Sequence, residues 1–127
     1  MFWLKRLFGL APVINQNRWV VLDVETSGLD PRQDRLLAIA AVCIHVNEDQ
    51  SLRIDIFDSF EAVLKQDLAS DKDNILLHGI GAQAQMMGED PQQVLRNFER
   101  WVGDAPLLAF HAAFDESMIQ RAYHYQL

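Results

Sequence analysis

Two carboxylates two residues apart, Asp23 and Glu25, interrupt the end of an apolar run, Arg18–Glu25. In a β-strand, residues i and i+2 point to the same face, so both side chains would project to one place. Two ionised carboxylates at one place repel each other, and divalent cations with oxygen ligands are the usual way to stabilise such a pair. The pair therefore predicts a metal site, with protonation or exposure to solvent as the alternatives.

Asp115 is a third candidate. It follows a short apolar segment at the expected turn from a strand, Ala105–Phe110, into the last helix. If that strand lies parallel to Arg18–Glu25, Asp115 emerges at the same end of the sheet as the other two acids. Ligands of open α/β sheets collect at the carboxyl ends of the strands. The alternative is that Asp115 only caps a helix N-terminus, which fits the local sequence at least as well.

The acid-x-acid pattern is weak by itself, because Asp71-Lys72-Asp73 has the same form. That second pair lies in a polar stretch, 67–74, for which we predict a solvent-facing loop. Context favours the first pair, which ends an apolar strand and precedes Thr26-Ser27-Gly28. For His78, two interpretations stay open: it lines the cleft, or it fixes a local turn.

Three strands are expected to position the first two acids. The continuous apolar character of Arg18–Glu25 predicts burial on both faces and a central place in the sheet. Leu36–Val46 and Leu52–Phe60 are the next two strands, joined through Asn47–Gln50 as an antiparallel hairpin. Glu61–Gln66 either continues the third strand or begins a helix, and the pattern does not decide between them.

The C-terminal half predicts a helix, a strand and a helix. Asp90 followed by Pro91 is typical of an N-cap and first helical residue, and Gly103 ends that helix. Ala105–Phe110 is a short buried strand, expected to lie parallel beside the first strand. Phe114–Leu127 is the last helix. The predicted fold class is therefore α/β, with three antiparallel strands followed by a parallel one.

Composition limits the remaining possibilities. A chain of 127 residues that is 50% hydrophobic fits one domain, which we place at 18–127 after an N-terminal arm at 1–17. The apolar runs are far shorter than a bilayer requires, so no membrane span is expected. Cys43 is the only cysteine and fits a reducing compartment, hence a cytoplasmic protein. A net charge of −7 excludes a general coat for nucleic acid, but not one local site where cations cancel the repulsion.

Four segments, in chain order, resemble the motifs of the DnaQ-like (DEDD) 3′–5′ exonucleases, the family that includes the proofreading subunit of bacterial DNA polymerase III. They are Val20–Leu29, Leu36–Val42, His78–Ile80 and Phe110–Asp115. The resemblance implies a ribonuclease H-like mixed sheet with flanking helices, of which the last strand and helix are missing from this chain.

The resemblance also implies an activity and a site. The activity is hydrolysis of terminal phosphodiesters at the 3′ end of single-stranded DNA or RNA, assisted by two Mg²⁺ or Mn²⁺ ions. A DNA polymerase subunit and a second copy of the chain are the implied candidate partners. By position, the implied metal ligands are Asp23, Glu25 and Asp115, and the implied substrate-binding residues are Thr26, Leu29, His78, His111 and Phe114.

The chain departs from the family pattern at three places. Ala38 stands where the family often has Glu, and Phe110-His111 stands where it usually has His-Asn. The third family motif, a His followed five positions later by Asp, supplies the general base and a further metal ligand. No such pair occurs in the 127 residues, which predicts a partial, C-terminally truncated exonuclease domain.

Two other functions are considered, and the first of them follows from these departures. A catalytically inactive nucleotide-binding or assembly module would keep the fold without the general base. A phosphohydrolase with an Asp-x-Asp nucleophile is disfavoured, because Glu25 occupies the second acidic position.

Overall fold

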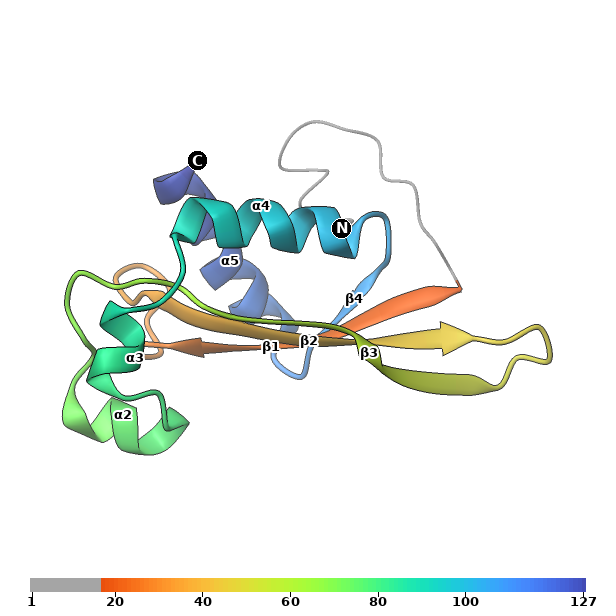
Figure 1. Ribbon diagram of the computed structural model, residues 1–127, viewed down its shortest axis with the longest axis horizontal. Helices are drawn as coiled ribbons and strands as arrows, with labels where there is room; N and C mark the ends of the chain where they lie inside the picture. The colour runs from red at the N-terminus through yellow and green to blue at the C-terminus, as the bar shows by residue number, and fades with distance from the viewer. Residues whose placement is uncertain (1–16) are drawn as a thin grey trace.

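The computed structural model describes residues 17–127, so nearly all of the expected arm at 1–17 lies outside the described residues. Figure 1 shows the arrangement of the elements. In chain order they are β1 (Arg18–Thr26), β2 (Leu36–Val46), β3 (Leu52–Val63), α2 (Lys72–His78), α3 (Ala82–Met86), α4 (Pro91–Val102), β4 (Leu107–Leu108) and α5 (Ala112–Gln126).

The sheet has the predicted topology. The strand order is β3-β2-β1-β4, with β1 antiparallel to β2, β2 antiparallel to β3, and β4 parallel to β1. The expected fold class, a mixed α/β sheet with β1 in its interior, is therefore confirmed. The fourth strand is shorter than expected: only Leu107 and Leu108 pair, with Val20 and Val21.

Helices α4 and α5 cover one face of the sheet (Figure 1). Val20, Leu22 and Val24 of β1 belong to the buried core that these helices complete. The alternate residues point to the opposite face, where Trp19 and Val21 are only half-buried. The apolar run predicted that β1 is buried on both faces. Within residues 17–127, only the face toward α4 and α5 is fully covered.

The boundaries of the two long helices follow local chemistry. Asp90 caps α4 by accepting a hydrogen bond from the Gln93 backbone N–H, and Pro91 is the first helical residue, as expected. Gly103 ends α4 with a positive φ of 59°. α5 begins at Ala112, two residues before the expected start. None of the helices in residues 17–127 combines the length and apolarity that crossing a bilayer needs.

The segment between β3 and α4 differs most from expectation. β3 continues to Val63, which answers the open question about Glu61–Gln66 in favour of the strand. The predicted loop at 67–74 is wrong in its last residues, because α2 begins at Lys72. Asp71 caps α2 by accepting a hydrogen bond from the Asn74 N–H, so one carboxylate of the second acidic pair has a structural role. Figure 1 places α2 and α3 beside the end of the sheet at which β1 ends.

Gly88 brings the chain after α3 against the end of β3. The Glu89 N–H donates to Val63 O, and the Lys65 N–H donates to Glu89 O, both at 2.8 Å. A Cβ built at Gly88 would lie 2.6 Å from Val63 O and 2.7 Å from Lys65 N, which are backbone atoms. This pairing therefore requires glycine, since any side chain would push the two backbones apart.

We expect Gly88→Ala to lower the free energy of unfolding by about 2 kcal/mol, because overpacking against backbone costs roughly this much. Urea unfolding monitored by circular dichroism measures the change. Gly81→Ala is the matched control: its φ is −64° and nothing lies within 4 Å of the added Cβ. Equal stabilities of the two variants would show that the backbone contact at Gly88 yields easily.

Candidate active site

The early end of β4 leaves part of the edge of β1 open. The Val20 N–H donates to Pro106 O across this edge, and alternate residues of a strand point their N–H groups the same way. The Val24 N–H therefore reaches the edge beyond Leu108, where no strand pairs with it. The carboxylate of Asp115, in the first turn of α5, lies near this N–H, and the N–H of Asp115 itself and that of Val24 both lower its pKa against the effect of burial. Asp115 is 5% exposed and is thus fixed against the backbone of β1.

Asp23 and Glu25 lie on the face of the sheet that α4 and α5 leave open. Asp23 is exposed and Glu25 is half-buried. Their register partners on β2 are Ala40 and Ala38, so only methyl side chains stand beside the two carboxylates on that strand. The predicted placement of both acids on one face at the end of β1 agrees with this geometry.

The charge of Asp23 affects the pKa values of the other two acids. Burial raises the pKa of Glu25, and the charge of Asp23 raises it further. The pKa of Asp115 is raised by the same two causes in the same order. His78 and His111 weakly oppose these shifts, at Glu25 and Asp115 respectively. In the described part of the chain, no Lys, Arg or His forms an ion pair with any of the three carboxylates.

The donor set fits hard divalent cations by its chemistry. Carboxylate oxygens are the ligands that Mg²⁺ and Mn²⁺ prefer, and the three acids have no protein cation to neutralise them. As they stand, however, no three His, Cys, Asp or Glu side chains of residues 17–127 are arranged to hold an ion. The charge of Asp23 acts on both Glu25 and Asp115. To bind a cation, the three side chains would have to converge.

His78 links α2 to the end of β1. Its Nδ1 accepts a hydrogen bond from the Ile80 N–H at 3.0 Å, so Nε2 carries the proton of the neutral ring. Nε2 in turn donates to Asn74 Oδ1 at 2.6 Å, and Asn74 Nδ2 donates to Thr26 O at 2.9 Å. This chain of bonds favours the interpretation in which His78 fixes a turn. It lies close enough to Glu25 to affect its pKa, but both its ring nitrogens are already engaged.

The loop after β1 presents Leu29 to solvent. Leu29 is 83% exposed, whereas Thr26 is buried and its Oγ1 donates to Gly28 O. Asp34 holds the loop by accepting hydrogen bonds from Ser27 Oγ and the Asp30 N–H. This geometry leaves the Leu29 side chain available to contact a ligand and makes Thr26 part of the loop framework.

The two remaining predicted substrate contacts lie near Asp115. His111 is exposed and is the N-cap residue of α5, without a side-chain capping bond. Phe114 is half-buried and packs against the hydrophobic core. Substrate contact by either residue stays a prediction, and the packing of Phe114 shows that it also has a structural role.

Sequence reasoning missed two residues that support the site, Asn74 and Gln85. Gln85 is fully buried, and its amide donates to Ser70 Oγ and Ile80 O and accepts from the Ser70 N–H. These bonds hold the segment that carries α2 and α3. The Gln-rich stretch around Gln85 has no apolar periodicity, so no sequence pattern could have identified the one buried amide.

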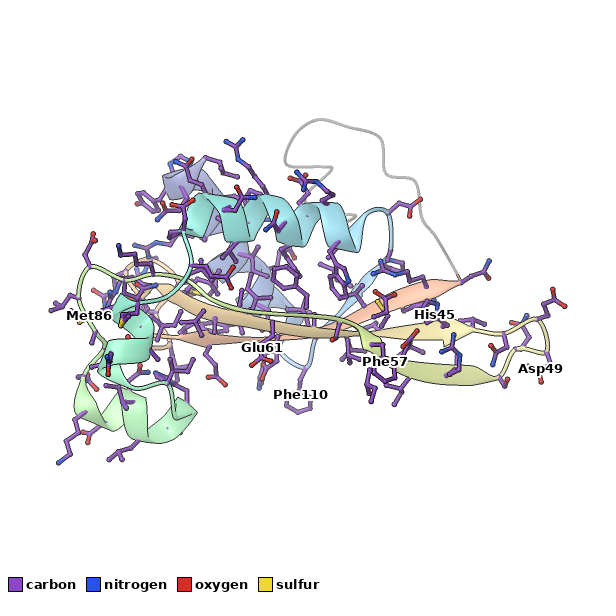
Figure 2. The ribbon with its side chains drawn as sticks, in the orientation of Figure 1. His45, Asp49, Phe57, Glu61, Met86 and Phe110 are labelled. Carbon is purple, nitrogen blue, oxygen red and sulfur yellow. The ribbon has the colours of Figure 1, made fainter. Side chains whose placement is uncertain are left out.

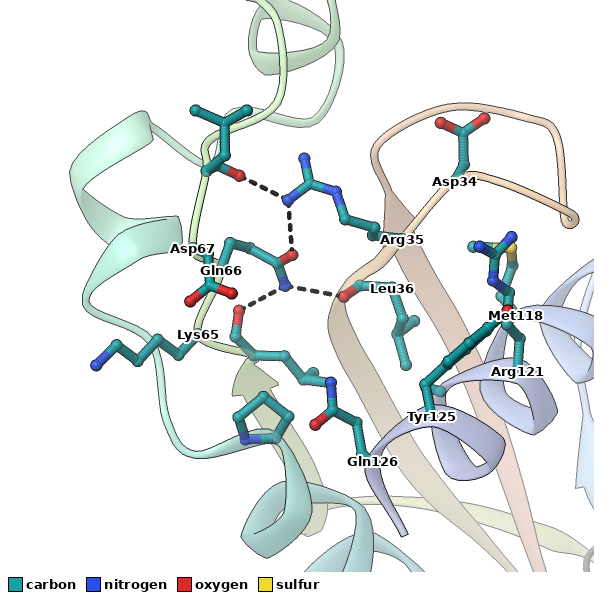
Figure 3. A pocket seen from close by; sticks show the side chains of 14 residues that line it. Asp34, Arg35, Leu36, Lys65, Gln66, Asp67, Met118, Arg121, Tyr125 and Gln126 are labelled. Atoms are coloured by element: carbon teal, nitrogen blue, oxygen red, sulfur yellow. Dashed lines mark hydrogen bonds between the residues drawn. The ribbon is translucent and has the colours of Figure 1, made fainter.

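A cavity of about 530 Å³ lies on the α5 side of the sheet and contains none of the three acids (Figure 3). Arg35 spans part of it, donating to Gln66 Oε1 at 3.0 Å and to Leu68 O at 2.6 Å. Gln66 Nε2 donates to Leu36 O and Leu64 O. These bonds make the cavity wall a brace between β2 and β3 rather than part of the acidic site.

The repulsion among the acids predicts that Asp23→Asn stabilises the fold. An acid whose pKa is raised by folding contributes stability below its unfolded pKa and loses that contribution as the pH rises through the folded value. Neutralising Asp23 lessens this loss for Glu25 and Asp115, so we expect a gain of about 0.5 kcal/mol at pH 7. Urea unfolding should show the gain at pH 7 and a smaller difference near pH 4.5.

Glu48→Gln is the control for that measurement. It removes one exposed negative charge from the hairpin loop at the other end of the sheet. It should leave stability unchanged at both pH values. Equal effects of the two substitutions would mean that net charge, and not the acidic site, is responsible.

Comparison with known proteins places this geometry in a family. Residues 20–125 match the model of the RNase_T exonuclease family. The PolC-type DNA polymerase III of Staphylococcus aureus is 32% identical over 111 residues, which are 87% of this chain and 7% of that protein. The chain therefore spans a small part of the curated relatives it matches.

Solved structures show the same fold. A product-bound structure of exonuclease I has a TM-score of 0.71 at 19% identity, covering 88% of this chain and 26% of the other. Escherichia coli exonuclease I in complex with a dT13 oligonucleotide has a TM-score of 0.69 at 19% identity, covering 87% and 24%. The match over nearly the whole described chain confirms the predicted ribonuclease H-like, DnaQ-like fold. The chain belongs to the RNase_T exonuclease family.

Proposed function

We propose that this chain is a metal-dependent 3′–5′ exonuclease domain that removes terminal nucleotides from single-stranded DNA or RNA. The observation that supports the proposal is the electrostatic influence of Asp23 on both Glu25 and Asp115 near the end of β1, in a chain of the RNase_T exonuclease family. Asp23, Glu25 and Asp115 would hold two Mg²⁺ or Mn²⁺ ions. Such ions, when bound, activate water and stabilise the leaving oxygen.

Charge supports the requirement for cations. The chain has a net charge of −7, and the acids lie where a phosphodiester would have to bind. Bound cations would reverse this local repulsion. The single-stranded substrate is inferred from the fold, since E. coli exonuclease I is solved with a dT13 oligonucleotide in the same architecture.

The chain's own residues would position the substrate. Asp115 is buried in the first turn of α5, so the packing of this helix would position one ligand. Leu29 is exposed on the loop that follows β1 and would contact the terminal nucleotide, with Thr26 contributing backbone groups. His78 would act through Asn74, which holds the Thr26 carbonyl, and is therefore a positioning residue.

A second candidate function is an inactive nucleotide-binding or assembly module of the same fold. It is favoured by one observation: no three His, Cys, Asp or Glu side chains of residues 17–127 are arranged to hold an ion. The similarity to a PolC-type polymerase makes a DNA polymerase subunit one proposed partner, and a second copy of the chain is another. For either function we propose a cytoplasmic location, on the ground of the single cysteine.

A digestion experiment separates these functions. With Mn²⁺ and a 5′-labelled single strand, we expect stepwise shortening from the 3′ end, because cations at the three carboxylates activate water. Asp115→Asn should slow shortening by at least about 100-fold, since a lost ligand removes several kcal/mol of transition-state stabilisation. Gel electrophoresis of timed samples gives the rates for DNA and RNA strands.

Glu48→Gln controls for the loss of one negative charge and should digest as fast as the unsubstituted chain. Calorimetric titration with Mn²⁺ and a nucleoside monophosphate is run in parallel. Binding that depends on Asp115 without any shortening would support the inactive module. Neither binding nor shortening would contradict both functions.

A further inference from the structure

Phe110 is the most exposed of the large apolar side chains in residues 17–127, at 94%. It lies two positions after the end of β4 and precedes Asp115 by five positions. Burying a phenylalanine side chain gains about 2 to 3 kcal/mol, so this ring leaves a large hydrophobic contribution unused in the described fold. Its place beside the acidic site suggests what it could contact.

The backbone fixes where Phe110 stands. Leu108 pairs with Val21, two residues before Asp23 on the same face of β1. The N–H groups of Phe114 and Asp115 both donate to His111 O, at 2.9 and 3.0 Å, which holds the turn between the ring and the acid. Figure 2 shows Phe110 pointing away from α4, to the face of the sheet on which the side chain of Asp23 is exposed.

One ring already orients Phe110. The His111 imidazole meets it edge to face, with ring centroids 4.8 Å apart and an interplanar angle of 85°. This contact restrains the ring and leaves nearly all of its surface open. A restrained, exposed aromatic ring near the proposed cation site would provide the two elements of single-strand recognition, a stacking surface and a backbone site.

We propose that Phe110 is a stacking site for an unpaired nucleobase of the strand whose 3′ end reaches Asp23, Glu25 and Asp115. The proposal rests on the proposed function and adds a subsite to it. The acids repel the sugar-phosphate backbone unless cations intervene, whereas a base is uncharged and presents a flat face. Stacking is sequence-tolerant because every base has such a face, so this subsite accepts all four bases and discriminates against an abasic nucleotide.

The experiment is a double-mutant cycle between Phe110 and the bases of the strand. Binding of a 5′-fluorescent ten-nucleotide strand is measured by anisotropy with Mn²⁺, with phosphorothioate linkages at the 3′ end to slow hydrolysis. Strands with one abasic nucleotide at each of the last four positions are compared. We expect Phe110→Ala to weaken binding of the intact strand at least about fivefold. At the position whose base stacks on Phe110, removing the base should not weaken binding to Phe110→Ala any further.

Phe57→Ala is the matched control, because Phe57 is 93% exposed and lies in β3, outside the turn that carries Asp115. It should bind every strand as the unsubstituted chain does. Phe110→Trp should restore binding, which a purely structural loss would not allow. Unchanged affinity of Phe110→Ala, or equal weakening at all abasic positions, would overturn the stacking site while leaving the nuclease proposal standing. A chain that neither binds nor shortens any strand would overturn both.

Discussion

Parallel pairing between β1 and β4 stops after two residues, and the candidate site depends on this interruption. A longer β4 would satisfy the Val24 N–H with a carbonyl and exclude a side chain from the edge. Because the pairing ends at Leu108, the Asp115 carboxylate can approach the open edge near Val24. A buried acid is thereby brought within electrostatic range of Asp23, at the cost of a raised pKa. The nearby N–H groups of Asp115 itself and of Val24 partly offset this rise in pKa.

The rest of the fold holds this edge in position. α4 and α5 pack on one face through Phe98, Met118 and Ile119, which fixes the first turn of α5 against β1. At the end of the sheet, Asn74 and His78 tie α2 to the Thr26 carbonyl. The loop after β1 is therefore supported from both sides, while its apolar side chain, Leu29, stays in solvent. Rigid support with exposed contact groups is typical of a binding surface.

The open face of the sheet has an acidic region and an apolar region, and this difference bears on substrate binding. Acids stand at the end of β1, whereas exposed apolar side chains, Phe110 and Leu108, stand at the neighbouring end of β4. A nucleic acid strand has the same two properties, a charged backbone and flat apolar bases. With cations at the acids, the two regions of this face would complement both parts of a strand.

The sequence by itself determined most of the strands, the two long helices and the common face of Asp23 and Glu25, because these depend on local patterns. Periodicity two places Asp23 and Glu25 on one face, and Asp90-Pro91 begins a helix whatever surrounds it. The sequence could not reveal α2, whose short length and exposed residues produce no periodic pattern, nor the buried amide of Gln85. Only the tertiary structure decided that β4 stops at Leu108 and that Asp115 is buried near Val24, ninety-one positions away. Long-range contacts of this kind arise from packing between elements, and no local pattern encodes them.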